Sequence, residues 1–312
     1  MSFRSGFVSL LGKTNTGKST LLNALLGAKV AIVSPRPQTT RTRVQGVLTR
    51  ESAQVVFVDT PGVHQPASRL GRQMMQAVGE ALEGVDLVLL LVDASQPPGA
   101  EDHLAIRRLQ SFGGTSFLLL NKMDKIAKPE LLPSIDHYRQ QHAFQEFIPI
   151  SALRGENLEL LERKIIEYLP EGPPYFPPDT LTDQPERFLA AEIIREKILA
   201  ATRREVPYAV AVVVDQFEEC RRAAPPEAQS PAGDRSLVRI HVTILVERPG
   251  QKAILIGVQG QRMKSIGRAA RKELEALLGC KVYLELYVKT RADWRQQPGV
   301  ERLIDWRFET AE

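Results

Sequence analysis

The fold of this 312-residue chain is decided by one stretch near its N-terminus, Gly12-Lys13-Thr14-Asn15-Thr16-Gly17-Lys18-Ser19. It matches the pattern G-x-x-x-x-G-K-[ST], follows an apolar segment at 6–12 and opens a helical pattern at 19–27. Glycines at both ends let successive backbone N–H groups turn onto phosphate oxygens, and the helix N-terminus adds its positive dipole. The lysine and the hydroxyl at the last two positions suit the terminal phosphates and Mg²⁺. The stretch therefore predicts that the chain binds a nucleoside triphosphate, without choosing the base.

Apolar strands and helical patterns alternate through the first half of the chain. Strands rich in Val and Leu are expected at 6–12, 53–59, 84–93, 115–121 and 147–151, and helices at 19–27, 69–83, 101–111 and 157–168. Such an alternation is typical of a mostly parallel sheet with helices on both faces. We therefore predict an α/β P-loop domain over residues 1–172.

A proline-rich stretch interrupts this pattern. Residues 170–185 contain six prolines, which can continue neither a helix nor a central strand, so we predict an interdomain linker at 173–185. A smaller α/β domain is expected over 186–312, with helices at 186–203 and 261–278 and strands at 206–217, 237–247 and 281–290. The segment at 223–236, rich in Pro, Ala, Ser and Gly, is expected to be a mobile loop.

Composition and charge narrow the class of protein. The two cysteines, Cys220 and Cys280, exclude a disulfide framework and a four-cysteine zinc site. The apolar runs are too short to span a bilayer, and we expect a cytoplasmic protein. Residues 1–50 carry eight Lys/Arg and no Asp or Glu, and residues 248–291 carry ten Lys/Arg against three Glu. Two basic stretches predict two anionic ligands or one long one.

Two motifs are expected to complete a metal site beside the phosphate loop. Asp59-Thr60-Pro61-Gly62 ends an apolar strand, where the Asp59 carboxylate suits the Mg²⁺ shell and the Gly62 N–H suits the γ-phosphate. Gln38-Thr39-Thr40-Arg41 lies in a predicted loop, from which a threonine would reach Mg²⁺ only when the γ-phosphate is present. The predicted site therefore senses the third phosphate.

Two further motifs choose the base. Asn121-Lys122-Met123-Asp124 follows a strand, and the Asp124 carboxylate can accept two hydrogen bonds from guanine that adenine cannot donate. Asn121 is expected to brace the phosphate loop, and the Lys122 stem to lie over the base plane. Ser151-Ala152-Leu153 follows the next strand, where a backbone N–H would read the guanine O6. The predicted nucleotide is therefore GTP or GDP.

The motifs GKTNTGKS, QTTR, DTPG, NKMD and SAL, in this order, resemble the five signature elements of translation-factor-related GTPases. QTTR resembles the switch of the Era family and of related modification-type GTPases, and by that likeness Thr40 is the metal-sensing residue. In the second domain, Gly257-Val258-Gln259-Gly260 stands between an apolar segment and a basic helix. This combination resembles a KH domain of type II, in which G-x-x-G clamps single-stranded RNA.

The two halves together resemble the Era family over nearly the whole chain, including PERFLAAEIIREKIL at 185–199, REVPYAVAV at 204–212 and GCKVYLELYVK at 279–289. The resemblance implies a slowly hydrolysing GTPase switch that binds the 3′ region of 16S ribosomal RNA and assists maturation of the 30S subunit. It also implies a monomer that associates peripherally with the cytoplasmic face of the inner membrane. The chain departs from the family inside its G-x-x-G, where Val258 and Gln259 replace the usual lysine.

The site residues follow from these motifs. Nucleotide binding is expected from Gly12, Lys13, Thr14, Asn15, Thr16, Gly17, Lys18, Ser19, Thr20, Asp59, Thr60, Pro61, Gly62, Val63, Asn121, Lys122, Met123, Asp124, Ser151, Ala152 and Leu153. Catalysis is expected from Lys18, Thr40 and Gly62, and Mg²⁺ ligation from Ser19, Thr40 and Asp59. RNA binding is expected from Lys252, Gly257, Val258, Gln259, Gly260, Arg262, Lys264 and Arg268.

Several alternatives stay open. Val63 stands where many GTPases place a glutamine that orients the attacking water, so slow hydrolysis is expected. Asn15 either helps to hold K⁺ beside the phosphates or only shapes the loop. His64 is interpreted as a surface residue rather than a base. The chain is alternatively an RNA-binding scaffold with nucleotide as a structural ligand, or a tRNA-modification-type GTPase.

Overall fold

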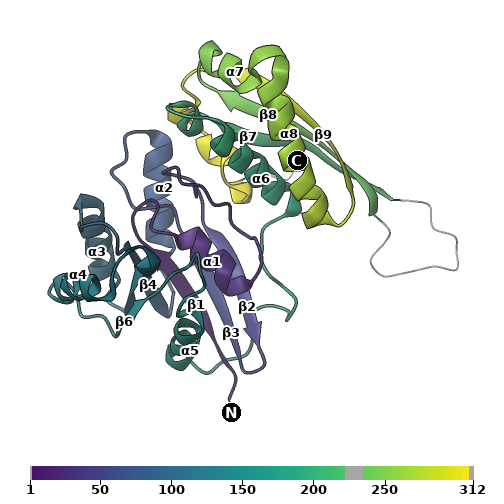
Figure 1. Cartoon of the computed structure of the whole chain (residues 1–312). Helices are drawn as coiled ribbons and strands as arrows, with labels where there is room; N and C mark the ends of the chain where they lie inside the picture. The colour runs from purple at the N-terminus through teal and green to yellow at the C-terminus, as the bar shows by residue number, and fades with distance from the viewer. Residues whose placement is uncertain (1, 222–234, 309–312) are drawn as a thin grey trace, which may run out of the picture. The chain divides into compact units, whose positions relative to one another are not determined.

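The computed structural model describes residues 2–221 and 235–308. The chain folds into two compact units, Met1–Gln184 and Pro185–Glu312 (Figure 1). Residues 223–234 of the predicted loop lie outside the described residues, and its last two residues, 235 and 236, belong to a strand.

A six-stranded sheet forms the centre of the first unit, in the order β2-β3-β1-β4-β5-β6. Every neighbouring pair is parallel except β2 with β3. The strands are β1 (Arg4–Leu11), β2 (Val44–Arg50), β3 (Ala53–Asp59), β4 (Leu87–Asp93), β5 (Ser116–Asn121) and β6 (Glu146–Pro149). The predicted mostly parallel sheet is confirmed. Sequence reasoning missed β2, because this edge strand is polar in part and interrupted by Gly46.

Helices cover both faces of this sheet. They are α1 (Lys18–Leu26), α2 (Arg69–Glu80), α3 (Ala100–Phe112), α4 (Leu131–Arg139) and α5 (Leu158–Tyr168). Leucines and isoleucines of α1 and α5 pack with Val8, Leu10 and Phe57 in one core cluster. Right-handed crossovers place α2, α3 and α4 on the other face (Figure 1). The strand order reverses at β1, and ligands of such sheets bind at the carboxyl ends of the strands beside that reversal.

The segment predicted as a linker at 173–185 lies along the first unit up to Gln184. The side-chain Oε1 of the buried Gln54 accepts hydrogen bonds from the backbone N–H groups of Tyr175 and Phe176 at 2.7 and 2.9 Å. Further along, Val47 N donates to Leu181 O at 2.9 Å. Proline removes the donors that a regular strand needs, so the segment is held by separate hydrogen bonds of this kind and not by a strand ladder. We name residues 173–184 the strap.

The second unit is built on a three-stranded sheet, β7-β8-β9, with β7 antiparallel and β9 parallel to β8. Its elements are α6 (Glu186–Ala201), β7 (Ala211–Arg221), β8 (Arg235–Val246), α7 (Pro249–Ile256), α8 (Gln261–Leu278) and β9 (Lys281–Thr290). Sequence reasoning missed α7, whose eight residues are too few to show a helical period. The order α-β-β-α-α-β is that of the predicted type II KH fold.

Both long helices of the second unit lie on the same face of its sheet. Side chains of α6 and α8 form one core cluster with the inward-facing residues of β7 and β8. After β9, the fully buried Trp294 donates from its indole N–H to Ala209 O at 2.9 Å and ties the C-terminal turns to the unit. Across the part of the chain that is described, no helix combines the length and the apolarity needed to cross a membrane.

Candidate functional site

The phosphate loop joins the carboxyl end of β1 to the start of α1. Gly12, Asn15 and Gly17 have φ angles of 153°, 63° and 99°, so the loop needs backbone conformations that glycine provides without strain. A Cβ on Gly17 would collide with the amide of Asn121. The loop therefore packs tightly against the motif that follows β5, although the two are far apart in the sequence.

Lys18 spans this loop from inside. Its ammonium donates to Gly12 O at 3.1 Å and to Lys13 O at 2.9 Å, and the residue is 6% exposed. Burial lowers the pKa of the Lys18 ammonium to about 8, although Asp59 and Glu101 pull it upward. A buried cation supported mainly by carbonyl dipoles is a strong attractor for an anion, and phosphate oxygens suit it.

Three oxygen-bearing side chains meet beside the loop. Ser19 Oγ donates to Asp59 Oδ2 at 2.7 Å, Thr40 Oγ1 lies 3.4 Å from the same oxygen, and the two hydroxyls are 2.9 Å apart. Burial raises the pKa of Asp59, against the pull of Lys18 and the two hydroxyls. Asp59 Oδ1 is buried and has no hydrogen-bond partner among the described residues. This oxygen-rich corner fits Mg²⁺, which prefers carboxylate, hydroxyl and water ligands.

Thr40, and not Thr39, is the threonine in this corner. The Thr39 hydroxyl donates to Arg36 O at 2.7 Å, within its own loop. Both residues line a pocket with Lys18, Ser19 and Gly62, together with Thr14, Asn15, Gly17, Thr20, Ile32, Val33, Ser34 and Gln38. The QTTR loop thus lies at the phosphate loop in this structure.

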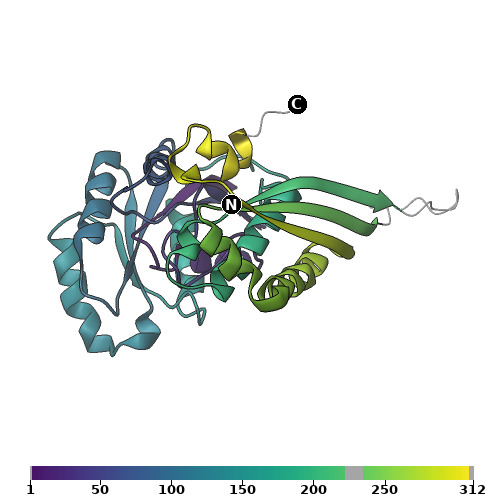
Figure 2. The ribbon, with the colours of Figure 1, turned by 90° about the horizontal axis from the view of Figure 1, so that it is seen from above.

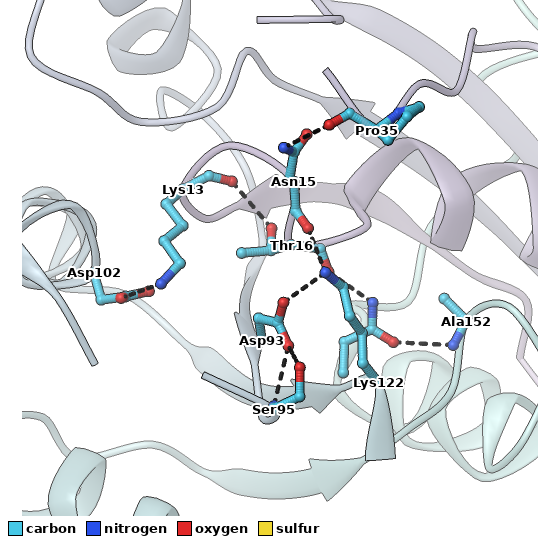
Figure 3. Close-up of polar contacts among 10 residues, drawn as sticks. Lys13, Asn15, Thr16, Pro35, Asp93, Ser95, Asp102, Lys122 and Ala152 are labelled. Carbon is cyan, nitrogen blue, oxygen red and sulfur yellow. Dashed lines mark hydrogen bonds and ion pairs between the residues drawn. The ribbon is translucent and has the colours of Figure 1, made fainter. Parts of the chain in front are cut away.

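The base-reading motifs follow the ends of β5 and β6, and Figure 3 shows Lys122 of the first motif with Asn15, Asp93 and Ala152. The Asn121 amide donates to Thr16 O at 2.7 Å, which is the predicted brace of the phosphate loop. The Lys122 ammonium donates to Asn15 O at 2.8 Å and pairs with Asp93 at 2.6 Å. Ser151 Oγ donates to Asp124 Oδ1 at 2.7 Å and orients that carboxylate. The motifs are therefore placed together, with Asp124 positioned as an acceptor.

One backbone donor of the predicted base site is already used. The Ala152 N–H donates to Asn121 Oδ1 at 3.0 Å, so it is engaged in bracing the site in this structure. Leu153 is 78% exposed at the rim of the site. While the Ala152 N–H stays bonded to Asn121, the backbone donor of this motif that can face a base is the Leu153 N–H.

His64 was expected at the surface, and this prediction is wrong. It is 5% exposed, and its Nδ1 lies 2.8 Å from Gly62 O. A carbonyl can only accept, so Nδ1 carries the proton in this contact. Val63 is fully buried, and its N–H donates to Gly12 O at 3.0 Å. The segment after Asp59 is thus bonded to the phosphate loop through Val63, and His64 is bonded within the segment. His64 is buried because it lies next to Gly71 of α2.

Two ion pairs near the site escaped sequence reasoning. Lys13 pairs with Asp102 at 2.7 Å, and Asp102, 2% exposed, also accepts the Gly99 N–H at the start of α3. The Lys122 pair with Asp93 is the second (Figure 3). Asp93 ends strand β4, next to the point where the strand order reverses, and this position could have indicated from the sequence that Asp93 lies near the site. No pattern in the sequence indicated the role of Asp102, because its partner Lys13 lies 89 residues away.

In the second unit, the G-x-x-G loop joins α7 to α8. Gly257 and Gly260 have φ angles of 71° and 74°, and Gln259 between them has 49°. A Cβ on Gly257 would press on the backbone and Cβ of Arg262, so the first glycine is needed for the close turn. Val258 is 78% exposed. The loop therefore presents backbone and an apolar side chain at its tip, at the N-terminus of the 18-residue helix α8.

The basic residues predicted for RNA lie around this loop. Arg262, Lys264 and Arg268 are exposed on α8, and Lys252 is half-buried on α7. The Arg262 guanidinium donates to Ile254 O, and so links the two helices. The structure thus brings these residues together on the helical layer of the unit.

Comparison with known proteins gives independent findings on both units. The sequence model of the family described as "50S ribosome-binding GTPase" matches residues 7–122, and that of the KH domain matches residues 205–295. The chain is 49% identical to GTPase Era of Syntrophus aciditrophicus over 300 residues, covering 96% of this chain and 94% of that protein. It is 47% identical to GTPase Era of Heliobacterium modesticaldum over 299 residues, covering 96% of each.

Two solved structures are similar over their whole length. A point variant of Aquifex aeolicus Era bound to GDP·AlF4⁻ superposes with a TM-score of 0.89 at 42% identity, covering 97% of this chain and 99% of that chain. A structure of Era with MgGDPNP and nucleotides 1506–1542 of 16S ribosomal RNA gives a TM-score of 0.90 at 42% identity, with the same coverage.

Proposed function

The chain belongs to the Era family of GTPases, and from this premise we propose that it is a GTP-controlled RNA-binding switch acting on the 3′ region of 16S ribosomal RNA during maturation of the 30S subunit. It hydrolyses GTP to GDP and phosphate, with Mg²⁺ as the metal. Two features support the RNA target: the solved relative that holds these nucleotides and the G-x-x-G loop beside a basic helix.

The observation that carries the switch is the corner formed by Ser19, Thr40 and Asp59. Thr40 belongs to a loop outside the phosphate loop, so its hydroxyl can stay in this corner only while that loop is held close. When bound, Mg²⁺ neutralises charge on the terminal phosphates. Ser19 and Asp59 would hold it in both nucleotide states, whereas Thr40 would report the γ-phosphate. A purely structural nucleotide site has no need of such a sensor, which favours the switch over the scaffold.

In this proposal hydrolysis depends on positioning. Lys18 would bind the β- and γ-phosphates, and the Gly62 N–H would bind the γ-phosphate from the opposite side. A Cβ on Gly62 would collide with Thr14, so only glycine lets the segment after Asp59 lie this close to the phosphate loop. The Val63 side chain is buried and cannot hydrogen-bond a water. These features support the slow intrinsic rate expected from the sequence.

We propose that Asn15 contributes to a K⁺ site beside the phosphates. Asn15 lines the pocket, adopts a left-handed backbone with φ of 63°, and donates from its amide to Pro35 O at 3.0 Å. The side chain therefore connects the phosphate loop to the segment that carries Thr40. Hydrolysis rates measured in K⁺ and in Na⁺ at equal ionic strength test this role. Equal rates would leave Asn15 with only a structural part.

In the second unit, we propose that RNA binds at Lys252, Gly257, Val258, Gln259, Gly260, Arg262, Lys264 and Arg268. The glycines allow close approach of a phosphodiester backbone, and the helix N-terminus and basic side chains attract its charge. Val258 and Gln259 replace the family's lysine with an apolar contact and an amide. This exchange removes one phosphate contact and is expected to weaken the salt dependence of binding.

The decisive experiment measures binding of an oligonucleotide that copies the 3′ end of 16S ribosomal RNA, with GDP and with a non-hydrolysable GTP analogue, at one fixed salt concentration. A scrambled oligonucleotide is the control. Selective binding that differs between the two nucleotides supports the switch. Selective binding that is equal in both states supports the scaffold instead, and absence of selectivity overturns the RNA target.

We further propose that the protein is a cytoplasmic monomer that associates peripherally with the inner face of the membrane. The support is the family resemblance. Sedimentation of the full chain tests the monomer, and flotation with anionic vesicles tests the membrane association.

A further inference from the structure

Among the described residues, both long helices of the KH unit pack on one face of its sheet, and the short turn Val300–Leu303 contacts β7. The core residues of β8, such as Val238, Ile240 and Val242, point toward α6 and α8. Side chains alternate along a strand, so Arg239, His241 and their neighbours on β9 point the other way. Figure 2 shows α8 on one side of these three strands. We name the outward residues Arg239, His241, Lys281, Tyr283, Glu285, Tyr287 and Lys289 the outer patch.

Two large aromatic residues lie exposed in this patch. Tyr283 is 49% exposed and Tyr287 is 53% exposed, and they stand four residues apart on strand β9. Exposed tyrosines are enriched where proteins bind other molecules. Neither belongs to the hydrophobic core cluster of this unit.

Glu285 fixes both rings. The Tyr283 hydroxyl donates to Glu285 at 2.5 Å, the Tyr287 hydroxyl donates to it at 2.9 Å, and His241 lies 3.0 Å from it. Both phenols reach a side chain that lies between them on the same strand, so each ring leans along the sheet instead of standing out from it. The hydroxyls are occupied, and what each ring offers to solvent is its apolar face.

Basic side chains flank the two rings. Lys281 and Lys289 are exposed at the two ends of the patch, and Arg239 is exposed directly opposite Tyr283 in the register of β8 and β9. Glu285 is engaged by three donors, which hold the pKa of its carboxyl below the ordinary value. Two carboxylates of β7 also face this region: Glu218 lies opposite Arg239, and Asp215 accepts the hydroxyl of Thr243, which lies opposite Tyr287. Exposed aromatic faces flanked by cations are the combination that proteins use to bind single-stranded nucleic acid.

We propose that the outer patch binds a second stretch of single-stranded RNA, with one unpaired base stacked on Tyr283, another on Tyr287, and backbone phosphates at Lys281, Lys289 and Arg239. This inference rests on the proposed RNA-binding function and adds a site to it. Four residues of strand span about 13 Å, several times the spacing of stacked bases, so the two bases are not stacking neighbours.

The outer patch and the G-x-x-G loop cannot hold the same nucleotides. The loop stands at the junction of α7 and α8, and Leu255 and Ile266 anchor these helices to the other face of the sheet. An RNA that reaches both sites must be longer than the stretch held at the loop. Affinity is therefore expected to rise with RNA length beyond that stretch, by the effective concentration of the linked segment.

The test uses the full chain with GDP bound and two RNAs, a short one that fills the loop and one extended by about ten unpaired nucleotides. The double variant Y283A/Y287A is expected to bind the long RNA about tenfold more weakly and the short RNA unchanged. The matched variant Y283F/Y287F keeps the rings and is expected to bind both normally. Leu132→Ala, which removes an apolar side chain that is 64% exposed in the first unit, is the surface control.

Photo-crosslinking supplies a direct readout. With 4-thiouridine in the extension, crosslinks to peptides containing Tyr283 or Tyr287 support the proposal. Equal affinity of the wild type and Y283A/Y287A for the long RNA, with crosslinks confined to 252–268, overturns it while leaving the loop site intact. Failure of the wild type to bind either RNA refutes the proposed function itself, a separate result.

Discussion

Ser19 and Thr40 place their hydroxyl oxygens 2.9 Å apart, and both reach the same carboxylate oxygen of Asp59. One hydroxyl belongs to the rigid start of α1 and the other to a loop that sequence reasoning could only place between two elements. Their contact makes the position of that loop depend on what occupies the corner, which is the physical basis of a nucleotide switch.

The first prediction concerns Thr40. Thr40→Val keeps the shape of the side chain and removes the hydroxyl, so the preference for the GTP analogue over GDP should fall about tenfold or more, with GDP affinity unchanged. Equilibrium binding of both nucleotides with Mg²⁺ measures this. Thr39→Val is the matched control, because the Thr39 hydroxyl donates to Arg36 O within its own loop. An equal effect of the two variants would contradict the assignment of Thr40.

Base selectivity should depend on Asp124. Asp124→Asn replaces an acceptor by a donor opposite the guanine N–H groups, and GTP affinity should drop about 100-fold. Xanthosine triphosphate, which presents a carbonyl in place of the amine, should bind the variant better than GTP does. Competition between the two nucleotides measures the exchange. Arg154→Ala, at the exposed residue 3.7 Å from Asp124, should change selectivity little. A variant that still prefers GTP would place base recognition elsewhere.

The buried ammonium of Lys18 predicts a pH dependence. Folding lowers the pKa of Lys18 to about 8 from its ordinary 10.5, so the free protein loses this proton as pH rises through about 8. Between pH 8 and 10.5 the unfolded chain binds more protons, and this group's contribution to stability therefore rises with pH in that window. A bound phosphate restores the charge, so nucleotide binding at pH 8 should take up roughly half a proton.

Calorimetry of GDP binding in buffers of different ionisation enthalpy measures that uptake. Nucleotide affinity should fall as pH rises above about 8. Lys18→Met removes the titrating group, and any binding that remains should show no uptake from it. The absence of proton uptake in the wild type at pH 8 would show that Lys18 is already fully protonated.

Val63 should limit the rate of hydrolysis. Val63→Gln introduces a side chain able to orient water, and single-turnover hydrolysis should accelerate about tenfold or more. Val63→Ala, which only shortens the side chain, should give no acceleration. Thermal unfolding checks that both variants stay folded. A rate unchanged by glutamine in a folded variant would show that water is positioned by other groups.

The strap should contribute to the stability of the first unit. Gln54→Ala removes the acceptor of two backbone N–H groups, at Tyr175 and Phe176, and should lower the free energy of unfolding by about 2 kcal/mol. Urea denaturation measures this loss. Gln76→Ala, at an exposed position on α2, should change stability by less than about 0.5 kcal/mol. Equal effects would mean that the strap adds no stability.

The sequence by itself determined the elements whose signals are local. The phosphate loop requires glycines because of its φ angles. Strands β3 and β9 and helix α8 match their predicted ranges because periodicity and terminal glycines act within a few residues. The motifs that bind phosphate, metal and base were also readable, because their chemistry requires particular residue types at the ends of strands.

Only the tertiary structure decided the contacts between distant parts of the chain. The pairing of Lys13 with Asp102, the burial of His64 and the attachment of the strap to Gln54 join residues that no local pattern links. The strands β7, β8 and β9 align Arg239 and His241 beside Tyr283 and Glu285 by their register alone. Such contacts form only when segments tens of residues apart come together during folding, so no local pattern in the sequence reports them.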